Sequence, residues 1–337
     1  MTPASGSCSA QRPPADGWTV LDLAPPAADL RADARAGLCA SPKRLSSKYF
    51  YDARGSRLFE AITRQPEYYL TRVETALLEA VAPRIAQRVG PNVHVVELGT
   101  GSGIKTRQLL DALDDPVAYT SVEISMAALL DSTRAVADQF PHLQLLPVCA
   151  DFTRPVPLPP AQRAARRTLV FFPGSTLGNF DDDDALELLR SIRETMGPDG
   201  LALLGFDLVK PVERLEAAYN DAAGVTAEFT LNLLARLNRE AEGRFDLNRF
   251  AHHAAYSVER ERIETAIVSR EAQTVQVAGE AIDFAAGERI EVEISRKYTG
   301  ASIRTIAAQA GLAVDETWTD DARDFALVLL RAADRAS

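Results

Sequence analysis

Short apolar runs alternate with longer amphipathic stretches through the middle of the chain, between residues 91 and 206. Each apolar run has the length of a buried parallel strand, and each longer stretch carries its apolar residues at helical spacing. This alternation predicts a doubly wound α/β fold, in which helices cover both faces of a mainly parallel sheet. The expected strands are 93–98, 117–122, 143–148, 168–172 and 200–206, and the expected helices are 104–113, 125–139 and 183–196.

The pattern changes after Lys210, where two helical stretches precede a series of strand-like segments. This part of the chain predicts an α+β insertion between strands of the large sheet. A further helix and two final strands then return the chain to that sheet, where we expect the two strands to pair antiparallel. A strand-like start at Trp18 opens the chain. The remaining expected helices are 27–38, 71–88, 212–219, 225–240 and 302–310, and the remaining strands are 254–258, 262–269, 273–277, 288–298, 314–318 and 325–330.

Three glycines at every second position follow the first sheet strand, in the segment VVELGTGSGIKT at residues 95–106. Glycine permits positive φ angles and close backbone approach, and the helix that follows presents free N–H groups to a polar ligand. Glu97 stands at the carboxyl end of the strand, where open α/β sheets bind ligands. An acid before G-x-G-x-G is typical of S-adenosylmethionine (SAM) methyltransferases, although a structural glycine turn gives the same pattern.

Two more acids stand at the ends of the next two expected strands. Glu123 lies about twenty residues past the glycines, a position suited to accepting hydrogen bonds from ribose hydroxyls. Asp151 can accept from an adenine amino group while Phe152 packs on the ring. A solvated loop explains each acid equally well when it is taken alone. Three acids at the tips of three successive strands, with Glu97 as the first, favour a nucleotide-like cofactor.

Two other segments supply candidate substrate contacts. Residues 48–69 contain four tyrosines, whose hydroxyls can line a pocket, while aromatic packing between domains is the alternative. Residues 171–180, FFPGSTLGNF, follow the fourth strand at the edge of the sheet beside the cofactor positions. Asn179 offers both a donor and an acceptor there, and a capping or turn role is its alternative.

A strict alternation of polar and apolar residues marks the last strand of the insertion, residues 290–298. Glu291, Glu293 and Ser295 are predicted to share one face of this strand. Val292 and Ile294 are predicted to share the other. A solvent-exposed face produces the same alternation, so the pattern alone does not decide between exposure and a binding role.

Composition and charge exclude several classes of protein. The chain has 337 residues, 46% hydrophobic and 25% charged, which is typical of a globular protein with room for two domains. Its net charge of −10 argues against nucleic acid as a partner, because phosphate contacts need a basic face. We expect no membrane span. Residues 1–17 are rich in Ser, Pro and Ala and lack the apolar core of a secretory signal, and we interpret them as a disordered tail.

The cysteines and histidines indicate neither disulfides nor a metal. Three cysteines and four histidines occur without any spacing that is typical of metal ligands or of a disulfide framework. The sequence therefore predicts reduced thiols, a cytoplasmic location and no bound metal.

Six motifs occur in order along the chain: KYFYDARGSRLFEAIT-x-x-PEYY, VELGTGSGIKT, FFPGSTLGN, GFDLVK, AYNDAAGVTA-x-F and VEISRKY. Together they resemble the histidine Nα-methyltransferases of ergothioneine biosynthesis, from about residue 30 to 332. The resemblance implies a class I SAM-dependent methyltransferase, with a Rossmann-like sheet and a second α+β domain. The substrate-binding domain would comprise residues 18–71 and 211–297, and the SAM-binding domain residues 72–210 and 298–335.

The resemblance also assigns roles by motif. Tyr68, Asn179 and Tyr219 would hold the carboxylate and amine of a free amino acid, and Tyr51 would bond its α-amino nitrogen. Glu293 and Ser295 would grip its imidazole ring. Catalysis is expected of Tyr51 and Asn179. The full substrate-binding set is Tyr68, Gly174, Asn179, Tyr219, Glu293 and Ser295, and the full cofactor-binding set is Glu97, Gly99, Gly101, Gly103, Lys105, Glu123, Asp151 and Phe152.

The implied activity is the SAM-dependent methylation of the α-amino group of free histidine, up to the trimethylated product hercynine, by a monomer. One departure from the family pattern leaves the side chain of the substrate open. Thr265 stands where the family usually has a methionine near the substrate ring. A related methyltransferase for another amino acid, such as tryptophan or tyrosine, is the first alternative. A non-catalytic protein that binds SAM or an amino acid is the second.

Overall fold

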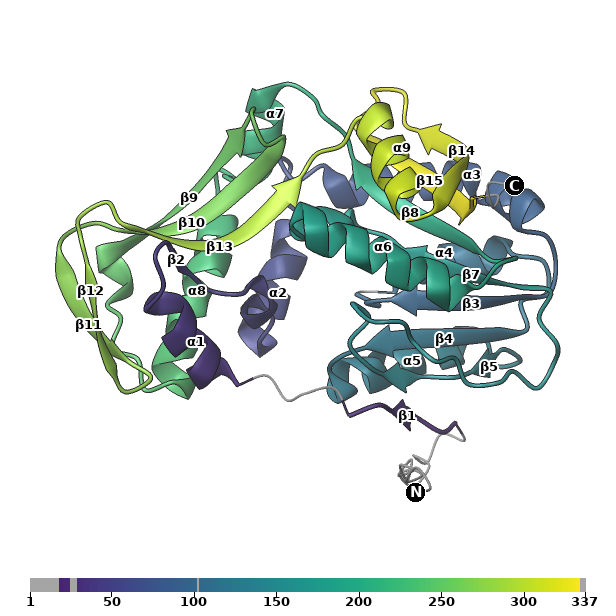
Figure 1. Cartoon of the computed structure of the whole chain (residues 1–337), viewed down its shortest axis with the longest axis horizontal. Coiled ribbons are helices and arrows are strands. Elements are labelled where there is room, and N and C mark those ends of the chain that lie inside the picture. The colour runs from purple at the N-terminus through teal and green to yellow at the C-terminus, as the bar shows by residue number, and fades with distance from the viewer. Residues whose placement is uncertain (1–17, 25–28, 102, 334–337) are drawn as a thin grey trace, which may run out of the picture.

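The structure, a computed structural model, describes residues 18–24, 29–101 and 103–333. Within these residues the chain forms two lobes, which Figure 1 shows side by side. One lobe is built on a nine-stranded sheet and the other on a four-stranded sheet, called the large and the small sheet below. The tail predicted for residues 1–17 lies outside the described residues.

The large sheet contains the predicted parallel strands. Its members are β1 (Leu21–Asp22), β3 (Val93–Leu98), β4 (Ala118–Glu123), β5 (Gln144–Leu145), β6 (Val148–Cys149), β7 (Arg167–Phe172), β8 (Leu201–Asp207), β14 (Leu312–Thr319) and β15 (Phe325–Ala332). The order is β1-β6-β4-β3-β7-β8-β15-β14, with β5 paired to β4. Among the described strands of this sheet, β15 alone runs antiparallel to the others, between its neighbours β8 and β14. The doubly wound sheet and its antiparallel end are therefore confirmed.

One expected strand of the large sheet is broken. The single strand predicted for 143–148 consists of β5 and β6, which both pair with β4. Pro147 stands between them and has no N–H to donate to a sheet ladder. The apolar run was long enough for one strand, but the proline divides it.

The N-terminal boundary of the substrate-binding domain also needs correction. Residues 18–71 were predicted to belong to that domain. In the structure β1 pairs parallel to β6 at the edge of the large sheet, and Trp18 packs into the core beneath that sheet. The chain enters the other lobe only with α1 (Leu30–Leu38).

Helices cover both faces of the large sheet, because each presents an apolar stripe to it. The helices α3, α4 and α5 bury their apolar residues against one face, and α6 and α9 against the other. The bounds of these helices are α3 (Leu70–Val89), α4 (Ile104–Ala112), α5 (Met126–Gln139), α6 (Asp182–Met196) and α9 (Gly300–Gln309).

The other lobe confirms the predicted α+β insertion. Helices α1, α2 (Ala53–Ile62) and α8 (Val225–Glu240) pack with the small sheet around a separate apolar core. The sequence did not predict α2, which begins where the Asp52 carboxylate accepts a hydrogen bond from the Gly55 N–H at 2.6 Å. The strands of the small sheet, in spatial order, are β2 (Lys43–Arg44), β13 (Arg289–Arg296), β10 (Arg262–Ser269) and β9 (Phe250–Ser257), and β11 (Gln273–Val277) forms a separate hairpin with β12 (Glu280–Phe284).

Three of the segments at which the two lobes meet, 174–179, 207–210 and 293–298, are called the lobe junction below. The Tyr298 N–H donates to the Asp207 carbonyl at 2.9 Å, and the Val209 N–H donates to the Tyr298 carbonyl at 2.9 Å. Strand β13 thus leads from the small sheet to the carboxyl end of β8, as Figure 1 shows. Among the described residues, we find no helix whose length and apolar character suit it to crossing a bilayer.

Candidate active site

The glycine turn between β3 and α4 has the conformation that the sequence predicts. Gly99, Gly101 and Gly103 have φ angles of 72°, 49° and 68°, which L-residues with side chains rarely adopt. A Cβ at Gly99 would lie 3.7 Å from the Phe152 ring, whereas one at Gly101 would meet nothing within 4 Å. Helix α4 begins at this turn without a side-chain cap. The start of α4 therefore presents backbone N–H groups that no side chain caps, next to a turn that carries an aromatic ring, and this arrangement fits the nucleoside of SAM.

Two of the predicted cofactor acids lie at the strand ends on the same edge of the sheet. The Glu123 carboxylate, at the end of β4, accepts a hydrogen bond from the Ile124 N–H at 2.9 Å. The Asp151 carboxylate accepts from the backbone N–H of Thr153 at 3.0 Å and from its hydroxyl at 2.7 Å. Both acids are half-buried and are oriented by their own turns. Carboxylates whose orientation is fixed in this way can accept hydrogen bonds from ribose hydroxyls and from an adenine amino group.

Glu97 lies beneath the turn rather than on its open side. Its carboxylate accepts hydrogen bonds from the Thr106 hydroxyl at 2.7 and 2.8 Å and from the Tyr119 hydroxyl at 2.6 Å. Burial raises the pKa of this carboxyl to about 7. Glu97 thus ties β3 to α4 and β4, and its predicted contact with the cofactor stays a prediction.

Lys105 is held by an acid that the sequence did not single out. Its ammonium lies 2.5 Å from one carboxylate oxygen of Glu74, and the other oxygen accepts from the Gly174 N–H at 2.7 Å. Glu74 is 1% exposed. The sequence pattern could have indicated Glu74, because this acid falls on the apolar face of α3, between the buried Leu70 and Leu78. This acid therefore connects the start of α4 to the loop after β7.

The loop after β7 is strained and closely packed. Ser175 has a φ of 56°, which is uncommon for a residue other than glycine, and its hydroxyl accepts from the Asp207 N–H at 2.9 Å. A Cβ at Gly178 would lie 2.8 Å from the Arg296 carbonyl oxygen, so this loop lies directly against β13. The exposed Asn179 side chain has no hydrogen-bonding partner among the described residues. Its amide is therefore free to meet a ligand at the lobe junction.

Five aromatic residues form a continuous series of ring contacts, called the aromatic wall below. The Tyr51 ring lies 5.7 Å from Phe59 and 5.8 Å from Phe229, in edge-to-face geometry. Phe59 lies 6.4 Å from Tyr68, which lies 6.4 Å from Tyr219. Such contacts fix the orientation of the rings and of their hydroxyls. The two predicted roles of the tyrosine-rich segment, aromatic packing and the lining of a pocket by hydroxyls, are therefore compatible, because rings that pack together also hold their hydroxyls close together.

Glu293 and Ser295 lie beside this wall. The charge of Glu293 raises the pKa values of Tyr51 and Tyr68, so these side chains are close enough to interact. The Tyr219 hydroxyl donates to the Ser295 hydroxyl at 2.7 Å. Burial raises the pKa of the Glu293 carboxyl to about 7, against the opposing effect of the nearby Lys297 charge. The predicted shared face of Glu293 and Ser295 is confirmed.

The alternation is interrupted closer to the start of β13. Thr265 pairs with Glu293, but the next residue, Ala266, pairs with Glu291, so the register shifts by one. A bulge of this kind places one extra residue on one strand and re-aims its side chains. Glu291 is exposed, and its predicted common face with Glu293 does not extend across the bulge.

Thr265 is 4% exposed, and its hydroxyl has no hydrogen-bonding partner among the described residues. We expect Thr265→Val to raise the free energy of unfolding by about 1 kcal/mol, because it removes a buried polar group that is unsatisfied. Urea unfolding of the unliganded protein measures this. Thr305→Val is the control, since that exposed hydroxyl already donates to the Ala301 carbonyl. A loss of stability in Thr265→Val would contradict the expectation.

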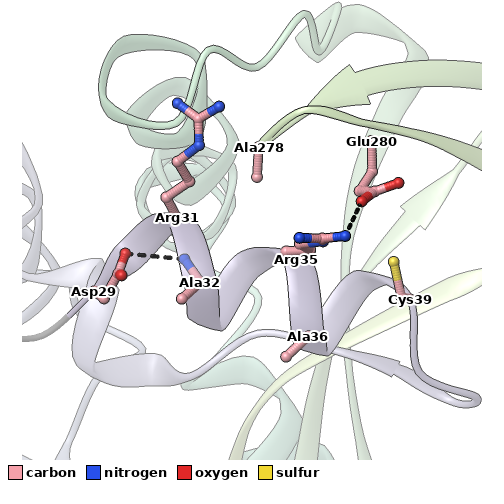
Figure 2. Close-up of a pocket in the computed structure, with 8 residues that line it drawn as sticks. All are labelled: Asp29, Arg31, Ala32, Arg35, Ala36, Cys39, Ala278 and Glu280. Atoms are coloured by element: carbon pink, nitrogen blue, oxygen red, sulfur yellow. Dashed lines mark hydrogen bonds and ion pairs between the residues drawn. The ribbon is translucent and has the colours of Figure 1, made fainter.

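Two surface hollows are lined by other residues. One, of about 680 Å³, lies between α1 and the β11–β12 hairpin, and Figure 2 shows its lining. Its Arg35 pairs with Glu280 at 2.5 Å, so the charges there satisfy one another. The second, of about 350 Å³, includes Arg262 and Arg296, which pair with Asp181 and Asp182 of the other lobe. None of the candidate site residues described above lines either hollow.

The sheet order, the glycine turn and the acids at the strand ends define a class I SAM-dependent methyltransferase. The family described as SAM-dependent, histidine-specific methyltransferases has a sequence model that matches residues 30–332, and the chain belongs to this family. The chain is 42% identical over 305 residues to a histidine N-alpha-methyltransferase of Mycolicibacterium smegmatis, and the match covers 89% of this chain and 94% of that protein.

Two further relatives agree with this assignment. A histidine N-alpha-methyltransferase of Mycobacterium tuberculosis is 39% identical over 89% of this chain and 94% of its own length. Ergothioneine biosynthesis protein 1 of Neurospora crassa is 30% identical over 82% of this chain, but the match covers only 32% of that longer protein. The predicted family, cofactor and type of enzyme are therefore confirmed.

Proposed function

We propose that the protein transfers methyl groups from SAM to the α-amino nitrogen of free L-histidine, up to the trimethylated product hercynine. This would be the first step of ergothioneine biosynthesis. The observation that carries the proposal is the position of Glu293 and Ser295 on one face of β13, beside the aromatic wall. The names of the two mycobacterial relatives support the same substrate. Both reactants are small and soluble, and one chain supplies every proposed contact, so we place the reaction in a cytoplasmic monomer.

The imidazole ring would be held between two polar side chains. The Glu293 carboxylate accepts a hydrogen bond from one ring N–H, and Ser295 bonds the second ring nitrogen. A hydrogen bond to a charged group contributes about 1.5–3 kcal/mol to binding. Histidine therefore gains affinity over amino acids whose rings lack both nitrogens.

The amino group would be oriented by Tyr51 and Asn179. Tyr51 keeps its proton at neutral pH, because the ordinary pKa of a phenol is about 10 and the charge of Glu293 raises this pKa further. It therefore acts as a neutral hydrogen-bonding group that directs the nitrogen lone pair, not as a base. SAM, when bound, supplies an electrophilic methyl group. Alignment of the amine with that group can provide several kcal/mol of barrier lowering without a covalent intermediate.

Repeated methylation would be assisted by the aromatic wall. Each added methyl group makes the nitrogen larger and, in the final product, permanently cationic. The faces of aromatic rings attract such a cation by about 0.5–2 kcal/mol. Tyr51, which is proposed to contact the amine, and Phe59, whose ring lies 5.7 Å from that of Tyr51, would supply these faces.

Mass spectrometry of the purified protein with SAM and each common amino acid in turn tests the proposal. We expect histidine alone to gain three methyl groups. A product with one or two methyl groups at complete turnover would remove the claim of trimethylation. No product from histidine would remove the proposed substrate.

A second candidate function is methylation of another free amino acid. It is favoured by Thr265, whose buried and unpartnered hydroxyl lies opposite Glu293 on the neighbouring strand. A substrate with a further polar group on its ring would satisfy that hydroxyl. The same panel of amino acids separates the two candidates, since only the second predicts a faster reaction with an amino acid other than histidine.

Histidine binding should strengthen as pH rises through 7. The pKa of the Glu293 carboxyl is raised to about 7, so this group is mostly protonated at pH 6 and mostly charged at pH 8. We expect the affinity of the wild type, relative to Glu293→Gln, to increase about tenfold between these two pH values. The variant corrects for titration of the histidine ligand itself. Calorimetry measures both affinities, and a constant ratio would contradict the assignment.

A further inference from the structure

A completely buried lysine lies directly behind the proposed imidazole site. Lys297 is 0% exposed, and its ammonium group has three hydrogen-bonding partners. They are the Asp207 carboxylate at 2.7 Å, the Ser295 hydroxyl at 2.8 Å and the Tyr219 hydroxyl at 2.9 Å. An ammonium has three protons and no lone pair, so these three contacts use all of its hydrogen-bonding capacity.

The lysine is anchored from the other lobe. Asp207 is also 0% exposed, and it accepts from the Tyr69 hydroxyl at 2.8 and 2.9 Å and from the ammonium of Lys210. Four of the sequence motifs, PEYY, GFDLVK, AYNDAAG and VEISRKY, thus meet in one cluster. Because Asp207 has two lysine partners, removal of one still leaves its charge paired.

The cluster dictates where the hydroxyl protons lie. Ser295 can accept two hydrogen bonds, and it receives one from Lys297 and one from Tyr219. Its own proton must then be donated to a group outside the cluster. The two hydroxyls carry two protons, of which one lies between them. If the shared bond ran in the opposite direction, the remaining proton would be on Tyr219 instead, so the pair always has one proton to donate to a group outside the cluster.

We propose that Lys297 is a positioning residue that turns Ser295 and Tyr219 into an obligatory proton donor, and thereby selects a neutral ring nitrogen as the acceptor. This inference rests on the proposed function. Glu293 accepts from the N–H on one side of the imidazole, and the Ser295–Tyr219 pair donates to the unprotonated nitrogen on the other side. A single neutral tautomer satisfies both contacts. A ring without a nitrogen acceptor leaves the donor unpaired, which disfavours its binding.

The charge of Lys297 supports the same arrangement. It opposes the effect of burial on the pKa of Glu293, and so favours the carboxylate form that accepts the ring N–H. The tyrosines Tyr51, Tyr68 and Tyr219 also face Glu293, but all three have raised pKa values and stay neutral near pH 7. Lys297 therefore influences both contacts to the ring while touching neither ring nitrogen.

Lys297→Met in the full chain tests the proposal. Calorimetry in the presence of S-adenosylhomocysteine compares the Kd of histidine with that of thienylalanine, whose ring has a similar size but no nitrogen. We expect the Kd of histidine to rise about 10- to 100-fold, and that of thienylalanine to change less than about threefold. The affinity for S-adenosylhomocysteine should be unchanged. A purely structural role would weaken all three ligands together.

Lys210→Met is the matched control, because Lys210 shares Asp207 but contacts neither Ser295 nor Tyr219. It should leave the preference for histidine over thienylalanine within about twofold of the wild type, given the distance of its contacts from the ring. An equal loss of preference in both variants would overturn the role of Lys297. A wild type that does not bind histidine would overturn the proposed function together with this inference.

A measurement on the wild type covers the case in which Lys297→Met does not fold. Nitrogen NMR of ring-labelled histidine, bound with S-adenosylhomocysteine at pH 8, where Glu293 is mostly charged, reports the protonation of each ring nitrogen. We expect a single tautomer with one fully protonated and one fully unprotonated nitrogen, whereas the free imidazole ring exchanges between its two neutral tautomers at this pH. A bound imidazolium with two N–H groups would overturn the inference, while leaving histidine as the substrate.

Discussion

Glu293→Gln is expected to weaken histidine binding by about 10- to 150-fold at pH 8, while SAM affinity stays within about twofold of the wild type. The carboxylate of Glu293 would make a charge-assisted hydrogen bond worth about 1.5–3 kcal/mol, which corresponds to that range of affinities. Gln keeps the size and one acceptor of the side chain but removes its charge. The loss should therefore appear in the KM and Kd for histidine, and little in the stability of the protein.

Glu291→Gln is the control for this experiment. Glu291 lies on the same strand, two residues earlier, but it is exposed and lies across the bulge from Glu293. We expect its substitution to leave both affinities unchanged. Parallel losses of histidine and SAM binding in Glu293→Gln would assign that residue a role in folding, and would separate β13 from the proposed imidazole site.

The large sheet could be predicted because its evidence is local. A buried parallel strand needs only a continuous apolar run, and the run at 93–98 is buried at every position. The glycine turn is equally local, since positive φ angles at Gly99, Gly101 and Gly103 restrict the residue type directly. The acids Glu123 and Asp151 follow from chain order, because successive parallel strands place their carboxyl ends at one edge.

The contacts between the lobes could not be predicted in the same way. Sequence spacing places Tyr219 and Ser295 in separate elements, and only folding brings their hydroxyls within 2.7 Å. A single charged residue in a polar motif, such as Lys297, gives no local sign that it will be completely buried. Glu97 shows the opposite case, in which a correctly located residue turns its side chain toward protein hydroxyls instead of the open turn.

Local chemistry also explains what was missed in the fold. Helix α2 depends on an Asp52 cap and on packing against α8, and neither is visible as a long apolar period. The predicted strand-like start at Trp18 contains β1, but its place in the large sheet was not predicted, because this two-residue strand depends on the edge that β6 offers. Of the two, α2 bears directly on the site, because it carries Phe59 of the aromatic wall.

Asp207→Asn should destabilise the folded protein strongly. Asp207 compensates two buried lysines, Lys210 and Lys297, whose side chains are 4% and 0% exposed. Removing its charge leaves both cations without a carboxylate, and breaking a buried pair in this way costs about 3–5 kcal/mol. We expect the free energy of unfolding, measured in urea at pH 7, to fall by that amount.

The loss in Asp207→Asn should be smaller at pH 9 than at pH 7. Burial already lowers the pKa of Lys210, and without Asp207 this shift would increase. The folded state then binds fewer protons than the unfolded state, so its stability rises with pH. Asp131→Asn is the control, because Asp131 pairs with Arg134 on the surface, where such pairs contribute about 0–1 kcal/mol. If both variants lose the same stability, the buried cluster does not hold the two lobes in the way described.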